Sequence, residues 1–189
     1  GIEPHDFDLC TSALPEQTEA VFADRQLVLA GKKHGTVGVV TVGGVVEITT
    51  FRTEGAYADN RHPDWVAFVQ EIQTDLARRD FTINAMAFHP EKGLVDLFSG
   101  RKDCREGILR CVGRAATRFD EDALRILRAL RFAARFGFQI EENTANAIKF
   151  FVEQVGISQN DAEVLIHNGF ISTDIITSFA NHGGLESFI

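Results

Sequence analysis

The chain has 189 residues, of which 44% are hydrophobic and 24% charged, and its mean hydropathy is −0.04. This composition is typical of a globular protein that builds its own core, and it excludes low-complexity and membrane-spanning classes. Three cysteines without a CxxC pair argue against a disulfide framework and a cysteine zinc site and favour a reducing cytoplasm. No apolar run approaches the length of a membrane span, so we expect no membrane partner.

Charge is unevenly distributed along the chain. The formal net charge is −8, yet residues 101–135 hold ten Lys/Arg against five Asp/Glu. An acidic chain with one basic segment favours a localised site for an anion over a generally basic surface. The alternative is a solvated basic helix face.

The first half of the chain predicts short elements. Residues 5–9 are extended, and residues 12–24 form a helix with Ser12 as a possible cap. Residues 36–42 and 45–51 are rich in β-branched residues and flank Gly43-Gly44, which predicts a hairpin. A helix is then expected from Asp64, because apolar residues recur at helical spacing: Trp65, Phe68, Val69 and Ile72.

The second half is more helical. Residues 81–88 are compatible with a strand or a helix, and residues 93–98 predict a strand. A helix over 119–138 is expected to begin with Asp120 as its cap and to end at Gly137. Residues 142–156 predict another helix, and short helices with loops follow from Ile157.

The helix over 119–138 has two predicted faces. At 100° per residue, one face is expected in the core: Ile126, Leu127, Leu130, Ala133 and Ala134. The opposite arc carries Arg125, Arg128, Arg131 and Arg135. Four arginines on one stripe indicate recognition of phosphate or base, whereas an ordinary salt-bridged solvent face is the alternative.

Acidic residues provide candidate metal ligands. Asp6 and Asp8 lie two positions apart, so on a strand both carboxylates point to the same face, and Glu47 lies in a Val/Ile-rich strand. Such carboxylates could form a two-metal cradle for phosphoryl transfer, although a solvated turn explains the pair equally simply. Similarly, Arg78-Arg79-Asp80 could clamp a phosphate or only end a helix.

Four segments together resemble the head and neck of bacterial tRNA nucleotidyltransferases, a family that contains CCA-adding enzymes and bacterial poly(A) polymerases. They are HDFDL (5–9), HGTVGVVTVGGVVEITTFR (34–52), RRDFTINAMAF (78–88) and EDALRILRALRFAARFGF (121–138). The resemblance covers residues 3–150 and implies an α+β fold, in which a small mixed or antiparallel sheet flanked by helices precedes a helical neck. It implies a head over 1–112, a neck over 113–150, and an unassigned segment over 151–189.

The resemblance also implies roles for individual residues. Asp6 and Asp8 match the family's metal-binding carboxylates, with Glu47 as the third catalytic carboxylate and two Mg²⁺ as the cofactor. Arg79 and Asp80 match the motif that contacts the ribose and phosphates of the incoming nucleotide. Asp122 and Arg125 match the pair that reads the base, and Arg128 and Arg131 extend this nucleotide-binding surface. The implied partners are CTP, ATP and the tRNA 3′ end.

Asp and Arg side by side offer an acceptor and donors. Cytosine and adenine each present an amino donor beside a ring acceptor, whereas uracil and guanine present the reverse, so one Asp/Arg pair could accept C and A. The leading hypothesis is therefore addition of C and A to tRNA with release of pyrophosphate. The alternatives are a poly(A) polymerase, an enzyme adding only CC or only A, and a non-catalytic nucleotide- or RNA-binding fragment. The last alternative follows from a departure, because the family carries a Gly-Gly…Arg-Asp segment ahead of the DxD pair and this chain begins at Gly1 without it.

Overall fold

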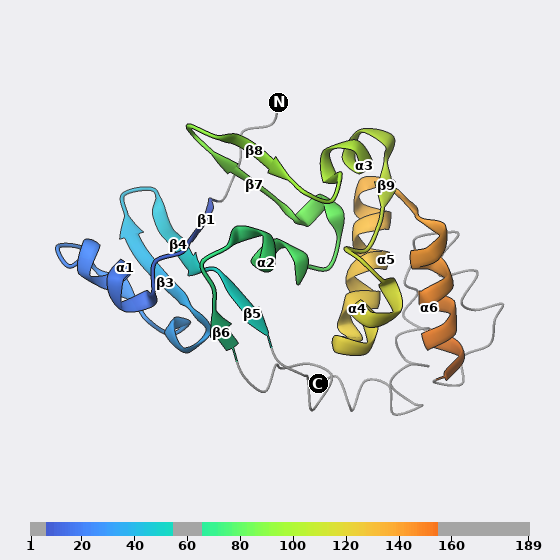
Figure 1. Ribbon diagram of the computed structural model, residues 1–189, viewed down its shortest axis with the longest axis horizontal. Helices are drawn as coiled ribbons and strands as arrows, with labels where there is room; N and C mark the ends of the chain where they lie inside the picture. Colours follow the sequence, from blue (N-terminus) through green and yellow to red (C-terminus); the bar gives the residue numbers. More distant parts are fainter. Residues whose placement is uncertain (1–6, 55–65, 155–189) are drawn as a thin grey trace. The chain divides into compact units, whose positions relative to one another are not determined.

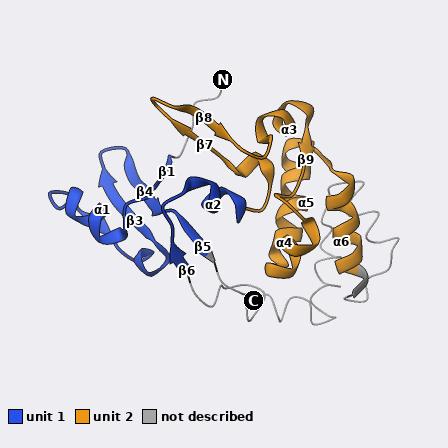
Figure 2. Cartoon of the chain, in the orientation of Figure 1, with its two compact units in different colours: residues 1–55, 65–78 blue, residues 56–64, 79–189 orange. Residues whose placement is uncertain are grey.

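The computed structural model describes residues 7–54 and 66–154. These residues form two compact units, the first made of residues 7–54 and 66–78, and the second of residues 79–154 (Figure 2). Helices and small sheets alternate in both units, so the α+β prediction is confirmed (Figure 1). Within the described ranges, no helix is long and apolar enough to span a lipid bilayer.

A four-stranded mixed sheet forms the centre of the first unit, in the order β1-β4-β3-β2. Its strands are β1 (Asp8–Thr11), β2 (Leu27–Val28), β3 (Thr36–Thr41) and β4 (Gly44–Thr50). The predicted hairpin is confirmed, with β3 antiparallel to β4 and Thr41 opposite Gly44. The turn residues are consequently Val42 and Gly43, and Gly44 opens β4 with φ +121°, a conformation that favours glycine. Parallel pairing of β1 with β4 makes the sheet mixed.

Helix α1 (Pro15–Val21) lies against β3 and β4. The expectation of Ser12 as its cap was wrong, because Leu14 occupies the cap position and Pro15 begins the helix. Proline is favoured in the first turn since its missing N–H needs no partner there. The Leu14 N–H instead donates to Oε1 of Gln17 at 2.8 Å. A 3₁₀ turn, η1 (Lys32–His34), precedes β3.

The predicted helix containing Phe68 and Val69 was wrong. Residues Val66–Phe68 form strand β6, antiparallel to β5 (Arg52–Glu54), and helix α2 (Ile72–Ala77) begins only afterwards. Three apolar residues are compatible with the periodicity of a helix or of a strand. Backbone pairing with β5 makes this segment a strand. Asp64 and Trp65 lie outside the described residues.

The second unit begins with the 3₁₀ turn η2 (Thr82–Asn84) and the hairpin of β7 (Met86–His89) and β8 (Gly93–Asp96). Residues 81–88, for which the sequence allowed a strand or a helix, form a 3₁₀ turn followed by a strand, and the strand predicted over 93–98 is confirmed for Gly93–Asp96. Helix α3 (Gly100–Glu106) leads to β9 (Ile108–Leu109), which pairs with β10 (Gln139–Ile140) in parallel.

The helix predicted over 119–138 is two helices, α4 (Ala115–Glu121) and α5 (Leu124–Phe136). The chain breaks at Asp122, whose backbone is extended with φ −151° and ψ 102°. Asp120 therefore lies inside α4 and is not a cap, whereas Gly137 ends α5 in the left-handed conformation, as predicted. The helix predicted over 142–156 is confirmed as α6 (Glu142–Gln154), and the short helices expected from Ile157 lie outside the described residues.

Helices α4, α5 and α6 enclose the core of the second unit, with α4 packed on both of its neighbours (Figure 1). The fully buried side chains at its centre include Phe81, Phe119, Leu109 and Ile148. The predicted core face of α5 is correct for Ile126, Leu130 and Ala133 only. Leu127 is half-buried and Ala134 is exposed, while Arg125 and Ala129 are buried.

Candidate functional site

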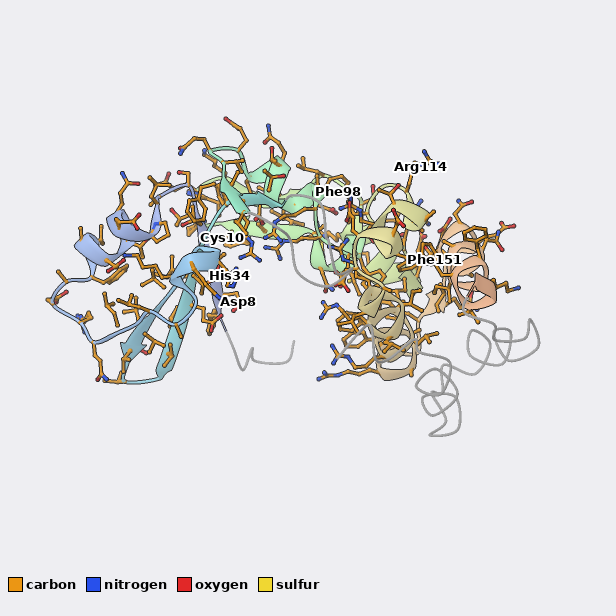
Figure 3. The ribbon with its side chains drawn as sticks, turned by 90° about the horizontal axis from the view of Figure 1, so that it is seen from below. Asp8, Cys10, His34, Phe98, Arg114 and Phe151 are labelled. Atoms are coloured by element: carbon orange, nitrogen blue, oxygen red, sulfur yellow. The ribbon has the colours of Figure 1, made fainter. Side chains whose placement is uncertain are left out.

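Two carboxylates lie side by side on the sheet of the first unit. Asp8, which is labelled in Figure 3, lies at the start of β1. It is the register partner of Glu47 on the parallel strand β4. Neighbouring strands lie about 4.8 Å apart, and side chains at paired positions share a face of the sheet. Both residues are exposed, and in the described part of the chain neither forms an ion pair. Adjacent unneutralised carboxylates repel each other, and a divalent cation would relieve that repulsion.

The structure therefore brings Glu47 next to Asp8, as the sequence predicted for the third carboxylate. Asp6 lies outside the described residues. Among residues 7–54 and 66–154, no cluster of three potential His, Cys, Asp or Glu ligands is present. The carboxylate oxygens of Asp8 and Glu47 are hard ligands of the kind that Mg²⁺ prefers.

The RRDFTIN segment spans the boundary between the two units. Arg78 ends α2 and contacts Asp75 at 2.8 Å, so it belongs structurally to the first unit. Arg79 begins the second unit, and its Nη1 donates to the carbonyl oxygen of Asn84 at 3.2 Å. The two adjacent arginines thus have different surroundings, and Arg78 fits the helix-ending interpretation.

The Asp80 carboxylate is buried and accepts three hydrogen bonds from its own unit. Oδ1 accepts the Phe81 N–H at 2.8 Å and the Asn84 Nδ2–H at 3.1 Å. Oδ2 accepts Nε–H of Arg128 on α5 at 2.7 Å. Residues 48 positions apart in the sequence therefore meet, and the turn after Arg79 is fixed to the side of α5.

Asp122 occupies the break between α4 and α5. Its Oδ1 accepts the N–H of Leu124 at 2.9 Å, which satisfies one of the free donors at the start of α5. Its Oδ2 lies 3.9 Å from Nε of Arg125. Burial raises the pKa of the Asp122 carboxyl above its ordinary value, against the opposing effects of the Leu124 N–H and the Arg125 guanidinium.

Arg125 is not part of an exposed arginine stripe. Only 7% of it is exposed, and its Nη1 donates to Oε2 of Glu121 at 2.7 Å. The break at Asp122 lets α4 fold back beside α5, so Glu121 and the carbonyl oxygen of Arg118 receive the guanidinium. Glu121 also accepts from Nη2 of Arg118 at 2.5 Å. Glu121 thereby fixes the Nη1 end of the Arg125 guanidinium, and Nε of Arg125 faces Asp122.

Arg128 and Arg131 lie further along α5 and are exposed. Each guanidinium lies 5.4 Å from the centre of the Phe132 ring. Arg128 joins the Asp80 turn, whereas Arg131 has no ion pair among the described residues. The structure thus links Asp80 with Arg128 and Asp122 with Arg125 inside the second unit, and pairs Asp8 with Glu47 inside the first.

Two supporting residues were missed by the sequence reasoning. Asn84 holds both Arg79 and Asp80, and Arg118 holds Glu121. Arg118 and Glu121 are three residues apart on one helix, a spacing that signals a pair. Asn84 had no such signal, because its contacts depend on the 3₁₀ turn.

Comparisons with known proteins show which family and which proteins this chain is similar to. Residues 1–110 match the family described as the poly(A) polymerase head domain. A CCA-adding enzyme of Ligilactobacillus salivarius is 45% identical over 166 residues, which are 86% of this chain and 41% of that enzyme.

Two solved structures are also similar. The Bacillus stearothermophilus CCA-adding enzyme in complex with CTP is 38% identical, with a TM-score of 0.70 over 95% of this chain and 44% of that chain. The Thermotoga maritima CCA-adding enzyme complexed with tRNA is 29% identical, with a TM-score of 0.63 over 98% of this chain and 44% of that chain. The chain spans less than half the length of each of these three relatives.

Proposed function

Because the chain belongs to the poly(A) polymerase head-domain family, we propose that it is the nucleotide-selecting part of a CCA-adding tRNA nucleotidyltransferase. The reaction adds C and A nucleotides from CTP and ATP to the 3′ end of tRNA and releases pyrophosphate. In this proposal residues 1–112 are the head, residues 113–150 are the neck, and the protein acts in the cytoplasm. The similarity to relatives named CCA-adding enzymes favours this reaction over poly(A) synthesis.

One observation carries the proposal: the 2.7 Å contact between Asp80 and Arg128. It joins the Arg79–Asp80 turn to the helix whose first turn holds Arg125 beside Asp122. Phosphate-binding and base-reading groups are thereby assembled within one unit. We assign Arg79 and Arg128 to the phosphates and ribose of the incoming nucleotide, with Asp80 fixing the orientation of Arg128.

Base selection is assigned to Asp122 and Arg125. Asp122 accepts a hydrogen bond from the exocyclic amino group of cytosine or adenine, and Arg125 donates to the adjacent ring nitrogen. Uracil and guanine place a carbonyl opposite the carboxylate and an N–H opposite the guanidinium. Each mismatched polar group would cost about 1–3 kcal/mol when left unsatisfied. Glu121 supports this selection because it holds the guanidinium of Arg125 in place.

The chemical step is assigned to the carboxylates of the first unit. The RNA 3′ oxygen forms a bond to the α-phosphorus of the nucleotide while the bond from that phosphorus to the bridging oxygen breaks, and pyrophosphate leaves. Asp8 and Glu47, together with Asp6, would hold two Mg²⁺ ions. When bound, such ions favour ionisation of the 3′ hydroxyl and neutralise charge that develops on the leaving group.

The test is incubation of the protein with Mg²⁺, tRNA lacking its CCA end, and each labelled nucleotide separately. We expect incorporation of C, incorporation of A once C is present, and none of U or G. Incorporation of A alone in long runs would replace the proposal by poly(A) synthesis. Binding of CTP without incorporation would indicate a non-catalytic nucleotide-binding fragment.

Asp8→Ala tests the carboxylate pair in the same assay. We expect the transfer rate to fall by about 100-fold or more, because a metal ligand is lost. The thermal midpoint should stay unchanged or rise, since the repulsion between Asp8 and Glu47 is relieved. Asp24→Ala is the matched control, because Asp24 is an exposed aspartate of the same unit. Equal activity of the two variants would remove Asp8 from the site.

A further inference from the structure

One side of α5 carries two arginines and two phenylalanines, and we call these four residues the outer face: Arg131, Phe132, Arg135 and Phe136. These residues recur at spacings of one and four, so they lie together on one side of the helix. Helix α5 contains no acidic residue. Within the part of the chain that the structure describes, Arg131 and Arg135 are exposed and neither forms an ion pair. The outer face therefore keeps its positive charge.

The phenylalanines of this face form a stacked pair. The rings of Phe132 and Phe136 are 5.9 Å apart and nearly parallel, at 10°. Phe132 is anchored in the core by an edge contact with Phe81, whereas Phe136 is 49% exposed. The guanidinium of Arg131 lies 5.4 Å from the centre of the Phe132 ring, and that of Arg135 lies 5.7 Å from Phe136. A planar apolar surface is thus exposed beside two uncompensated cations.

A ligand for such a face must combine a flat apolar group with negative charge. Single-stranded RNA does so, because its bases stack on aromatic rings while its phosphates attract arginine. Arg131 and Arg135 are four residues apart, or about 6 Å along the helix axis, so they could contact successive positions of one strand. An acidic peptide would satisfy the arginines but would place no flat apolar group on the exposed part of the Phe136 ring.

We propose that the outer face binds the unpaired 3′ end of the acceptor RNA, with a base stacked on Phe136 and phosphates held by Arg131 and Arg135. This inference rests on the proposed function, because it makes the RNA to be extended the occupant. The same helix carries Arg125 and Arg128 in the nucleotide site. Helix α5 would thereby hold both reactants.

The experiment is fluorescence anisotropy of a labelled RNA hairpin with an unpaired 3′ tail, without nucleotide, compared with a blunt-ended hairpin. Phe136→Leu keeps the apolar volume but removes the ring, and we expect Kd for the tailed RNA to rise about tenfold. Phe136→Trp should bind as tightly as the unchanged protein or more tightly. In the double variant Arg131→Gln/Arg135→Gln, the slope of log affinity against log salt should become shallower by about 1.4.

Matched controls come from the same unit. Phe88→Leu removes an aromatic ring that is 73% exposed on β7, and Arg101→Gln/Arg105→Gln removes two exposed cations from α3. These variants should bind like the unchanged protein. The inference is overturned if they weaken binding equally, if Phe136→Leu has no effect, or if tailed and blunt RNA bind alike. Equal competition by polyglutamate would assign the face to an acidic protein partner instead.

Failure of this inference differs from failure of the proposed function. If CTP is incorporated and Phe136→Leu leaves KM for RNA unchanged, only the outer-face assignment is wrong. If no nucleotide is incorporated but tailed RNA binding depends on Phe136, only the proposed transfer reaction is wrong.

Discussion

In the proposed function Asp122 has two roles, one for each oxygen of its carboxylate. Oδ1 satisfies the Leu124 N–H at the start of α5, while Oδ2 faces Arg125 and is the atom available to a base. An amide at this position can keep the Leu124 contact through its oxygen and present a donor with its nitrogen. Helix initiation and base selection can therefore be separated by one substitution.

Asp122→Asn is expected to raise the preference for UTP relative to CTP by roughly five- to thirtyfold, because the uracil carbonyl would then meet a donor. The measurement is kcat/KM for both nucleotides. Asp120→Asn is the matched control, since Asp120 is exposed in α4 and should leave the ratio unchanged. Glu121→Gln should lower kcat/KM for both nucleotides together, because it loosens Arg125. An unaltered ratio in Asp122→Asn would mean that this residue does not read the base.

The pKa of Asp122 predicts a pH effect on selection. Because burial raises this pKa, the carboxyl takes up a proton at a higher pH than an ordinary aspartate and becomes a donor. The CTP preference should decline as the pH falls from neutral, and Asp122→Asn should lack this decline. The linked effect on the free energy of unfolding has the opposite pH dependence. As the pH rises from the ordinary aspartate pKa to the raised one, the unfolded chain ionises more readily than the folded protein, so the folded protein loses stability. Asp122→Asn has no carboxyl at this position and should lose less stability over that range. Parallel pH profiles for both proteins would contradict the assignment.

At the scale of elements, the sequence correctly predicted the helices and strands whose signals lie in neighbouring residues. Glycine positions and β-branched runs located the hairpin of β3 and β4, and Gly137 located the end of α5. Errors arose where pairing with distant residues decided the outcome. Val66–Phe68 became a strand because β5 offered backbone partners, and the break at Asp122 exists because α4 packs on both α5 and α6.

The same limit applies to the candidate site. Periodicity placed Arg125 on the arginine arc, but it could not show that Glu121 and the Arg118 carbonyl oxygen draw the side chain inward. Proximity of Asp8 to Glu47 was predictable once both were assigned to strands of one sheet. The contact of Asp80 with Arg128 was not, because it depends on how the η2 turn meets α5.

Gly100 in α3 tests whether packing against the η2 turn positions the candidate nucleotide site. A Cβ at this position would overlap the carbonyl oxygen of Thr82 in η2, the turn that carries Asn84 and so positions Asp80. Gly100→Ala should therefore lower the free energy of unfolding by about 1–3 kcal/mol and weaken CTP binding as well. Gly43→Ala is the control, because its Cβ would meet only Thr41 Oγ1 at 3.8 Å. Destabilisation without any change in CTP affinity would show that η2 does not position the nucleotide site.

At the scale of the whole molecule, the two units have separate cores. The first is centred on Val37, Val39 and Ile48, and the second on the cluster around Phe119 and Ile148. Each core is built from residues of its own unit. Local stability can therefore differ between the units, as it does between cooperative units in other proteins.

Phe119→Ala should lower the stability of the second unit by about 3–5 kcal/mol, because Phe119 is fully buried. In hydrogen exchange, amides of α4, α5 and α6 should lose protection while those of β3 and β4 keep it. Val37→Ala should have the reverse pattern, with a loss of about 2 kcal/mol in the first unit. Simultaneous loss in both units for either variant would show a single cooperative structure.

The contact between Asp80 and Arg128 also has an evolutionary consequence. Replacing Arg128 alone leaves a buried carboxylate without its cation, and replacing Asp80 alone removes the ion pair that joins the start of the η2 turn to α5. A substitution at position 80 or 128 is therefore expected to persist only when the other position changes in the same lineage. Across relatives, positions 80 and 128 should covary despite their separation, and a homologue lacking one charge should also lack the other.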